Sequence, residues 1–141
     1  MYCLTAYAAF DSAHFLKDYN GKCANLHGHR WTIEAQFSGT ELQGTGEKRG
    51  MLIDFGDIKH AVRELADNMD HALIIEKNSL RESTMAAMQE EGFRVIELPF
   101  RPTAENLAKY FFDELKAQGL PVSMVTVYET PDNKAGYRED I

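Results

Sequence analysis

Three histidines in one stretch of the chain have the residue type and the spacing of a metal site. His27 and His29 alternate along an expected strand, so both imidazoles project from the same face. Zinc binds neutral imidazoles in a tetrahedral shell, and catalytic zinc sites combine three protein ligands with one open position. With His14 on a neighbouring strand, the sequence predicts an open three-histidine metal site at the end of a buried sheet face.

Two other interpretations of this stretch remain open from spacing alone. A His-x-His pair near the start of a strand is more often a pair of ordinary surface or core histidines than a ligand pair. A closed structural zinc site would require Cys-x2-Cys spacing, which Cys3 and Cys23 do not have. The concentration of histidine around Cys23 favours the open site, in which this cysteine is a nearby thiol rather than a ligand.

Asp70 and His71 form a second candidate site directly after an expected helix. A carboxylate beside an imidazole can orient the ring and keep it basic, as in enzymatic proton relays, although ordinary surface pairs also end helices. A free thiol is mostly protonated at neutral pH, and a neighbouring histidine or metal increases its thiolate fraction. We therefore expect this pair to act on Cys23 if the fold, or a neighbouring subunit, brings the groups together.

Two glutamates are candidates for binding a ligand. Glu129 ends an expected strand and shares the parity of Val125 and Val127, so it points to a face where an unpaired carboxylate is costly. A ring with adjacent N–H donors, such as a pterin or a guanine, would satisfy this carboxylate with two hydrogen bonds. Glu105 could supply a further acceptor, or could simply complement the dipole in the first turn of an expected helix.

The elements that must position these residues are indicated by the polarity pattern. Apolar and polar residues alternate over 29–38, which is typical of a half-buried antiparallel strand. Apolar residues at helical spacing predict amphipathic helices over 57–69 and from Thr103, as N-cap, to Gly119. Further expectations are strands over 2–15, 93–98, 122–129 and 136–140, and a short helix over 80–92 with Met85 and Met88 in the core.

Length, order of elements and composition narrow the class of protein. Strands at both ends with helices between them favour a single α+β domain over 1–141, with an antiparallel sheet covered by helices on one face. The net charge of −7 argues against nucleic-acid binding, but a local cluster such as Lys17, Lys22 and Arg30 could still hold a small phosphorylated ligand. No membrane-spanning run or secretory signal is visible, and only two cysteines are present, so we expect a cytoplasmic protein.

The candidate site residues lie within six short segments of the chain. The segments, in chain order, are FDSAH at 10–14, KCANLHGH at 22–29, LIDFGDIK at 52–59, MDH at 69–71, PTAENLA at 102–108 and VYET at 127–130. Together they resemble the 6-pyruvoyl-tetrahydropterin synthase / 6-carboxy-5,6,7,8-tetrahydropterin synthase family, almost from end to end and in the same order. The resemblance implies the tunnelling fold (T-fold), in which protomers join their sheets into a barrel, as a trimer or hexamer, with active sites at subunit interfaces.

The resemblance also implies a role for each residue at a matching position. The zinc ligands would be His14, His27 and His29. The proton-transfer relay, drawn from one or two subunits, would be Cys23, Asp70 and His71. The pterin ring would be anchored by Glu129 and Glu105. Zinc remains an expectation from ligand type, since imidazoles also suit other transition ions.

The family substrate is 7,8-dihydroneopterin triphosphate, whose hydroxylated side chain would meet zinc at its open position, where the metal acts as a Lewis acid. The cysteine thiolate would move side-chain protons, and triphosphate would be eliminated. The carboxy enzymes also cleave the three-carbon side chain and release acetaldehyde on the route to the deazapurine of queuosine. The pyruvoyl enzymes keep that side chain.

The spacer between Cys23 and His27 favours the carboxy branch, because its three residues resemble the bacterial carboxy enzymes and the pyruvoyl enzymes have a longer one. A zinc-stabilised binding module or a zinc hydrolase ranks lower, since neither requires the cysteine together with the Asp70–His71 pair. The segment 74–98 is longer than in compact bacterial members, and a role for it as an interface or lid remains open.

Overall fold

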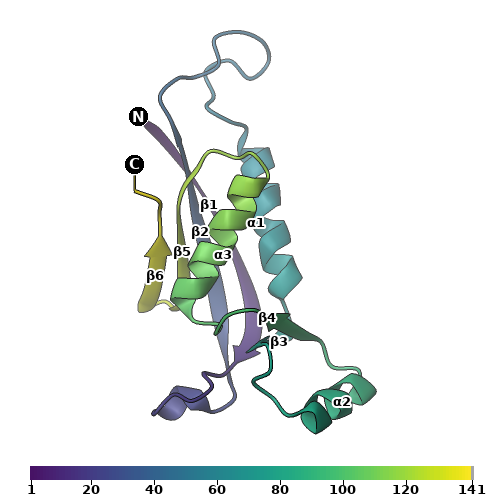
Figure 1. The fold of residues 1–141 in the computed structure, drawn as a ribbon. Helices are drawn as coiled ribbons and strands as arrows, with labels where there is room; N and C mark the ends of the chain where they lie inside the picture. Colours follow the sequence, from purple (N-terminus) through teal and green to yellow (C-terminus); the bar gives the residue numbers. More distant parts are fainter. Residues whose placement is uncertain (141) are drawn as a thin grey trace.

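The computed structural model describes residues 1–140, which form a sheet with two long helices on one face (Figure 1). The strands are β1 (Tyr2–His14), β2 (His27–Gly39), β3 (Ala72–Glu76), β4 (Val95–Leu98), β5 (Val122–Thr130) and β6 (Asn133–Tyr137). The helices are η1 (Lys22–Ala24), α1 (Phe55–Met69), α2 (Glu82–Glu91) and α3 (Ala104–Ala117). The predicted α+β class is confirmed.

The sheet has the order β4-β3-β1-β2-β5-β6. β1 and β2 pair antiparallel along their whole length, from Tyr2 opposite Gly39 to His14 opposite His27, and β5 and β6 continue the antiparallel part. The expectation of a purely antiparallel sheet is wrong, because β3 pairs parallel with β1 and β4 parallel with β3. α1 carries the chain back along the sheet, so β3 continues in the direction of β1.

Strand β3 was not expected from the sequence. Its five residues, Ala72–Glu76, are almost all buried, and such a short apolar run shows no periodicity that distinguishes a strand from a helix. It matters for the site, because it begins directly after Asp70 and His71 and pairs with β1 at Ser12 and Ala13. The candidate relay therefore lies at the start of a sheet strand.

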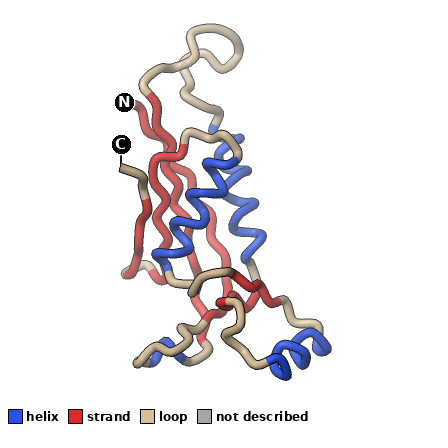
Figure 2. Tube along the Cα trace, in the orientation of Figure 1, coloured by secondary structure: helices blue, strands red, loops and turns tan. Residues whose placement is uncertain are grey.

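Helices α1 and α3 cover the same face of the sheet, α1 over β1 and α3 over β5 and β6 (Figures 1 and 2). Their apolar stripes meet a layer of fully buried side chains from the strands, which includes Phe10, Trp31, Ile33 and Phe37. His14 and His29 follow the parity of this layer and lie at its end. The predicted alternation along β2 is confirmed, and it places the histidines on the core side of the sheet.

Side-chain caps fix where both long helices begin. The Asp54 carboxylate accepts a hydrogen bond from the Gly56 N–H at 2.8 Å, so α1 starts at Phe55, two residues before the predicted position. The Thr103 hydroxyl accepts from the Asn106 N–H at 3.1 Å, as predicted for an N-cap. α3 then ends just before Gly119, whose φ of +78° suits glycine.

Two further expectations are wrong: the burial of the methionines of helix α2, and the residue at which the last strand starts. Helix α2 forms, but none of its residues is buried, and Met85 and Met88 are only half-buried because the helix projects from the end of the sheet (Figure 1). The last hairpin turns earlier than predicted, since the Thr130 hydroxyl accepts from the N–H groups of Asp132 and Asn133. Strand β6 therefore starts at Asn133 rather than at 136.

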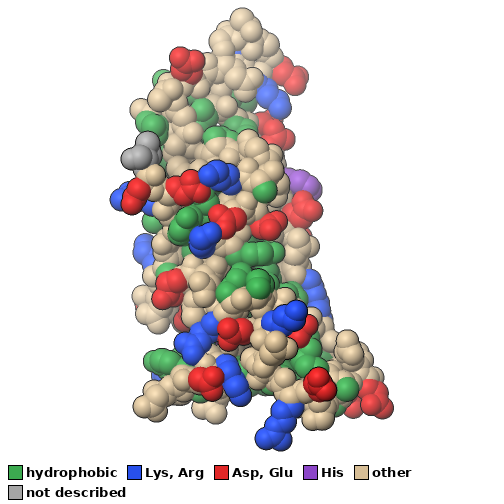
Figure 3. All heavy atoms as spheres, in the orientation of Figure 1, with side chains coloured by type: hydrophobic (Ala, Val, Ile, Leu, Met, Phe, Trp, Pro, Cys, Tyr) green, Lys and Arg blue, Asp and Glu red, His purple; other side chains and the backbone are tan. Residues whose placement is uncertain are grey.

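Acidic and basic side chains are interspersed over the face that carries α1 and α3, with apolar side chains between them (Figure 3). This mixed surface shows no continuous basic area on that face. Among the described residues, no helix combines the length and the hydropathy that crossing a membrane requires.

Candidate metal centre and neighbouring residues

The register of the two longest strands brings the three histidines together. His14 ends β1 opposite His27, which begins β2, and His29 follows on the same face. Their candidate ligand atoms all lie within 4.8 Å of one another, and the group could hold a metal ion. His14 is buried, whereas His27 and His29 are half-buried, so the cluster is closed on its core side.

Backbone carbonyls fix the tautomers of two of these rings. Nδ1 of His14 lies 2.8 Å from the Pro102 carbonyl oxygen, and Nδ1 of His27 lies 2.7 Å from that of Asn25. A carbonyl can only accept, so each Nδ1 donates and each neutral ring keeps its lone pair on Nε2. Hydrogen bonds of this kind, from the ring nitrogen that does not bind the metal, commonly orient imidazole ligands.

The candidate ligand nitrogens lie close together. Nε2 of His14 and Nε2 of His27 are 3.0 Å apart, but with both Nδ1 atoms protonated neither Nε2 can donate to the other. Nε2 of His29 is buried without a hydrogen-bond partner among residues 1–140. Buried polar atoms are rarely left unsatisfied. A cation held between the three rings would satisfy these nitrogens.

Electrostatics keep two of the rings neutral. Burial lowers the pKa of His14 to about 4, with the neighbouring rings of His27 and His29 adding to the decrease and the hydrogen bond to Pro102 opposing it. Burial also lowers the pKa of His29, against the opposing effect of the Glu129 carboxylate. A neutral imidazole is the form that binds a metal, so these rings are ready to bind one at neutral pH.

Trp31 forms the apolar wall of the cluster. Its ring meets that of His14 edge-on at a centroid distance of 4.8 Å and that of His29 at 5.2 Å. Its indole N–H donates to the Ser12 carbonyl oxygen at 3.1 Å, so the ring is fixed although it is fully buried. The wall excludes water from the core side and leaves the opposite side of the histidines accessible.

The two candidate ligand-binding glutamates line one cavity beside this centre. Glu129 at the end of β5 and Glu105 in the first turn of α3 border a cavity of about 290 Å³ together with Asn133 and Lys134. Glu129 is half-buried and lies near enough to His29 to affect its pKa. The structure therefore places both carboxylates on one cavity, with Glu129 near the histidine cluster.

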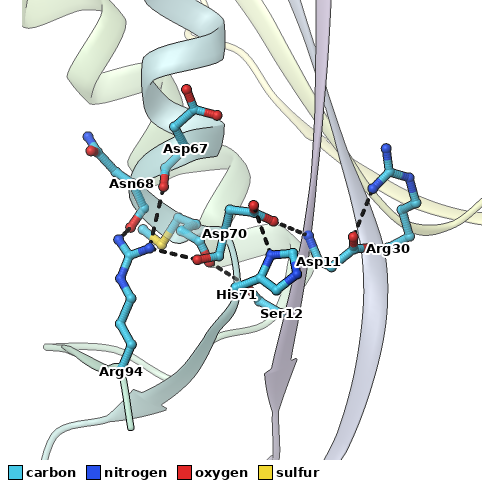
Figure 4. Close-up of polar contacts among 9 residues, drawn as sticks. Asp11, Ser12, Arg30, Asp67, Asn68, Asp70, His71 and Arg94 are labelled. Carbon is cyan, nitrogen blue, oxygen red and sulfur yellow. Dashed lines mark hydrogen bonds and ion pairs between the residues drawn. The ribbon is translucent and has the colours of Figure 1, made fainter. Parts of the chain in front are cut away.

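Asp70 and His71 contact each other at the end of α1. Oδ2 of Asp70 lies 2.9 Å from Nδ1 of His71, and Oδ1 accepts the Asp11 N–H at 2.8 Å (Figure 4). The hydrogen bond from Asp11 and the one from His71 lower the pKa of Asp70. His71 is mostly exposed and borders a cavity of about 640 Å³ that His29 and Arg30 also line. His71 thus faces open space that His29 also borders.

Cys23 is not joined to that pair within the chain. It lies in η1 and is half-buried, and its carbonyl oxygen accepts the Leu16 N–H at 2.9 Å. Within residues 1–140 its thiol makes no hydrogen bond to a side chain, and it does not line the cavity beside His71. The structure brings together the three histidines with Glu129, Glu129 with Glu105 on one cavity, and separately Asp70 with His71.

Comparison with known proteins decides the family. The family model described as 6-pyruvoyl tetrahydropterin synthase matches residues 3–140. The chain belongs to the 6-pyruvoyl tetrahydropterin synthase family. It is 38% identical over 142 residues to a 6-carboxy-5,6,7,8-tetrahydropterin synthase of Haemophilus influenzae, with 99% of this chain and all of that relative covered. A protein of the same name from Aquifex aeolicus is 33% identical, with 84% of this chain and 77% of the relative covered.

Solved structures have the same fold as this chain. An uncharacterized protein from Wolinella succinogenes matches with a TM-score of 0.78 at 19% identity, covering 99% of this chain and 98% of that one. The 6-pyruvoyl tetrahydropterin synthase of Caenorhabditis elegans matches with a TM-score of 0.69 at 22% identity, covering 99% and 96%. The tunnelling fold that the sequence resemblance implied is confirmed for the single subunit.

Several groups that support the site were not expected from the sequence. The carbonyl oxygens of Pro102 and Asn25 hold two histidines, but a backbone carbonyl has no residue type that would reveal it. The place of Trp31 was predicted by the alternation over 29–38, since it continues the parity of His27 and His29 along β2, but its role as a wall of the site was not. Arg94, which contacts the loop before His71, lies in a segment with no recognisable motif.

Proposed function

We propose that this member of the 6-pyruvoyl tetrahydropterin synthase family is a zinc-dependent 6-carboxy-5,6,7,8-tetrahydropterin synthase. Its substrate would be 7,8-dihydroneopterin triphosphate, and its products 6-carboxy-5,6,7,8-tetrahydropterin, acetaldehyde and triphosphate, as in the route to queuosine. The observation that carries the proposal is the grouping of three histidines whose candidate ligand atoms lie within 4.8 Å of one another, with Glu129 near His29 and on one cavity with Glu105. The names of the two bacterial relatives, at 38% and 33% identity, support this branch of the family.

In this proposal His14, His27 and His29 hold the metal. Zinc, when bound, supplies a Lewis acid that makes the protons of the substrate side chain easier to remove. The carbonyls of Pro102 and Asn25 keep Nε2 of two ligands unprotonated, and Trp31 keeps water from the core side.

Glu129 and Glu105 would bind the pterin ring. A pterin presents neighbouring N–H groups, which a carboxylate can accept in pairs, and charged acceptors make the stronger hydrogen bonds. Glu129 borders both the cavity and the histidine cluster, so a ring bound there would direct its side chain towards the metal centre. This position would orient the substrate for reaction.

Cys23, Asp70 and His71 would move the protons. The Asp70 carboxylate accepts a hydrogen bond from Nδ1 of His71. Nε2 of His71 is then free to take a proton from the Cys23 thiol, which would raise the thiolate fraction of this cysteine. Because no contact joins Cys23 to this pair within the described chain, we propose that the relay is completed in a homo-oligomer, a trimer or hexamer, by joining of subunits. The free thiols of Cys3 and Cys23 fit a reducing location, and we propose the cytoplasm.

The deciding experiment is to incubate the zinc-loaded protein with 7,8-dihydroneopterin triphosphate and to identify the products by mass spectrometry. We expect 6-carboxy-5,6,7,8-tetrahydropterin and acetaldehyde in equal amounts. A 6-pyruvoyl product would keep the site assignments and move the protein to the other branch of its family. No conversion by a folded, zinc-loaded protein would refute the catalytic proposal and favour a pterin-binding role.

A further inference from the structure

The C-terminal end of α1 is capped by one long backbone hydrogen bond, from the Asp70 N–H to the Asp67 carbonyl oxygen at 3.4 Å. Its last turn contains no basic residue, and Asp70 follows in an extended conformation. The next residue, His71, has a φ of +52°, in the left-handed region that a side chain with a Cβ disfavours. Such a conformation persists only where the surrounding structure holds it. The Asp70–His71 turn therefore depends on contacts from elsewhere in the chain.

One side of the turn is held by β1. The His71 N–H donates to the Asp11 carbonyl oxygen at 2.7 Å, and the Asp11 N–H donates to Oδ1 of Asp70 at 2.8 Å. The Asp11 carboxylate in turn pairs with Arg30 at 2.9 Å (Figure 4). These bonds hold the Asp70–His71 turn against β1, but they do not satisfy the carbonyl groups at the C-terminal end of α1.

Those carbonyl groups are satisfied chiefly by Arg94. Its guanidinium donates to the Asp70 carbonyl oxygen at 2.6 Å, to that of Asp67 at 3.5 Å, and to that of Asn68 (Figure 4). The Met69 carbonyl oxygen accepts from the Ser12 hydroxyl. Helix ends leave their last carbonyls without intrahelical partners, and a cation near them is favourable. One guanidinium thus joins the last turn of the helix to the residue before His71.

The backbone of Arg94 is itself fixed. Its carbonyl oxygen accepts the Leu73 N–H at 3.0 Å, immediately before β4 pairs with β3. Arg94 belongs to the segment 74–98, whose role the sequence left open, and α2 within that segment buries no residue. The contact to the Asp70–His71 turn is therefore a clear connection between this segment and the candidate relay.

We infer that Arg94 is a positioning residue, which holds the Asp70–His71 turn so that the imidazole of His71 has the orientation that proton transfer requires. The inference rests on the proposed function, because it assigns His71 to the relay. It differs from a general stabilising role, since the Arg94 side chain is exposed and its hydrogen bonds go to backbone carbonyls at the end of α1 and in this turn.

The test compares three variants in the full-length, zinc-loaded protein. Arg94→Ala removes the guanidinium. Arg94→Lys keeps the positive charge but not the planar set of N–H donors that contacts several carbonyls at once. Arg49→Ala is the matched control. Arg49 also donates to a carbonyl, that of Gly46 at 2.8 Å, but in the exposed loop before α1. Amide hydrogen exchange at His71 reports the turn without substrate, and kcat and KM report the reaction.

We expect Arg94→Ala to accelerate exchange of the His71 amide by about tenfold or more. It should lower kcat by about 10- to 100-fold while KM stays within about twofold, because misplacing a reacting group costs rate rather than binding. Arg94→Lys should recover part of both effects, and Arg49→Ala should show neither. In a His71→Ala background, Arg94→Ala should lower kcat no further, because the two residues act as a unit.

Unchanged exchange at His71 would overturn the inference, whatever the activity. So would faster exchange with an unaltered kcat, or losses from the two substitutions that simply add. The exchange measurement requires no substrate, so it decides the inference even if the wild-type protein fails to convert the proposed pterin. That failure would refute the proposed function separately.

Discussion

Nε2 of His14 and Nε2 of His27 lie 3.0 Å apart, and both rings donate their Nδ1 protons to backbone carbonyls. Two unprotonated nitrogens at this distance repel each other unless a cation lies between them. The fold holds them there through a full-length β1–β2 pairing and through the loop before α3 that carries Pro102. The backbone therefore fixes the positions of these two lone pairs, and their short separation predicts that the site binds a metal ion.

The first prediction is that His27→Ala abolishes stoichiometric zinc binding. We expect affinity to fall by at least about 100-fold, because loss of a ligand costs more than the 10- to 100-fold loss seen for outer-shell partners. His60→Ala is the matched control, since His60 is 82% exposed on α1 and lies outside the cluster. Zinc content by mass spectrometry and affinity by chelator competition measure the effect. Equal zinc content in the two variants would contradict the assignment.

The second prediction concerns the pH dependence of the metal-free protein. The pKa of His14 is lowered from 6.5 to about 4 in the folded chain, so the unfolded state binds more protons between these values. Stability is therefore fully present above pH 6.5 and is lost as the pH falls towards 4. The His14 contribution amounts to about 3 kcal/mol at most. Burial lowers the pKa of His29 as well, so its contribution has the same sign.

Urea denaturation in the presence of a chelator, repeated from pH 7.5 to pH 4, measures this loss. His14→Gln removes the titrating group, and we expect its stability to fall less steeply over the same range. His60→Ala should retain the steep fall of the wild-type protein. If the wild-type protein and His14→Gln have the same slope, the burial of a neutral His14 is not what destabilises the chain in acid.

Local sequence pattern predicts those parts of this site that depend on spacing. The parity of His27, His29 and Trp31 follows from alternation along one strand, and the N-cap at Thr103 follows from residue type. The pairing of His14 with His27 needs only the hairpin between β1 and β2. These features come from neighbours in sequence, where periodicity and turn chemistry act.

The remainder of the site depends on contacts between residues far apart in the chain. Strand β3 is too short to show a period, and its direction is set by the path of α1. Met88 has the residue type of a core side chain, but α2 projects away from the sheet and buries none of its residues. The contact of Arg94 with the end of α1 joins positions whose separation no local pattern encodes.

The third prediction is that Cys23→Ala abolishes turnover but retains zinc. A proton-transfer group contributes about 10²- to 10⁴-fold to rate, so we expect kcat to fall within that range. Zinc content should not change, because the three histidines converge without the thiol. Cys3→Ala is the control, since that cysteine is exposed at the start of β1. Full turnover by Cys23→Ala would instead support a hydrolase or another chemistry that needs no thiol.

The last prediction concerns recognition of the pterin ring. Glu129→Gln keeps the shape of the side chain but replaces one acceptor oxygen with a donor and removes the charge. A hydrogen bond to a charged group contributes about 1.5–3 kcal/mol, so we expect pterin affinity to fall by about 10- to 100-fold. Glu105→Gln should weaken binding less, because Glu105 is exposed and Glu129 is half-buried.

Glu114→Gln, on the exposed side of α3, is the matched control for the loss of one negative charge. Calorimetric titration of each zinc-loaded variant with a reduced pterin measures the affinity without requiring turnover. The order Glu129, then Glu105, then Glu114 in loss of affinity is the expected outcome. If all three substitutions have the same small effect, the ring binds elsewhere, and the cavity between α3 and β5 is not the pterin site.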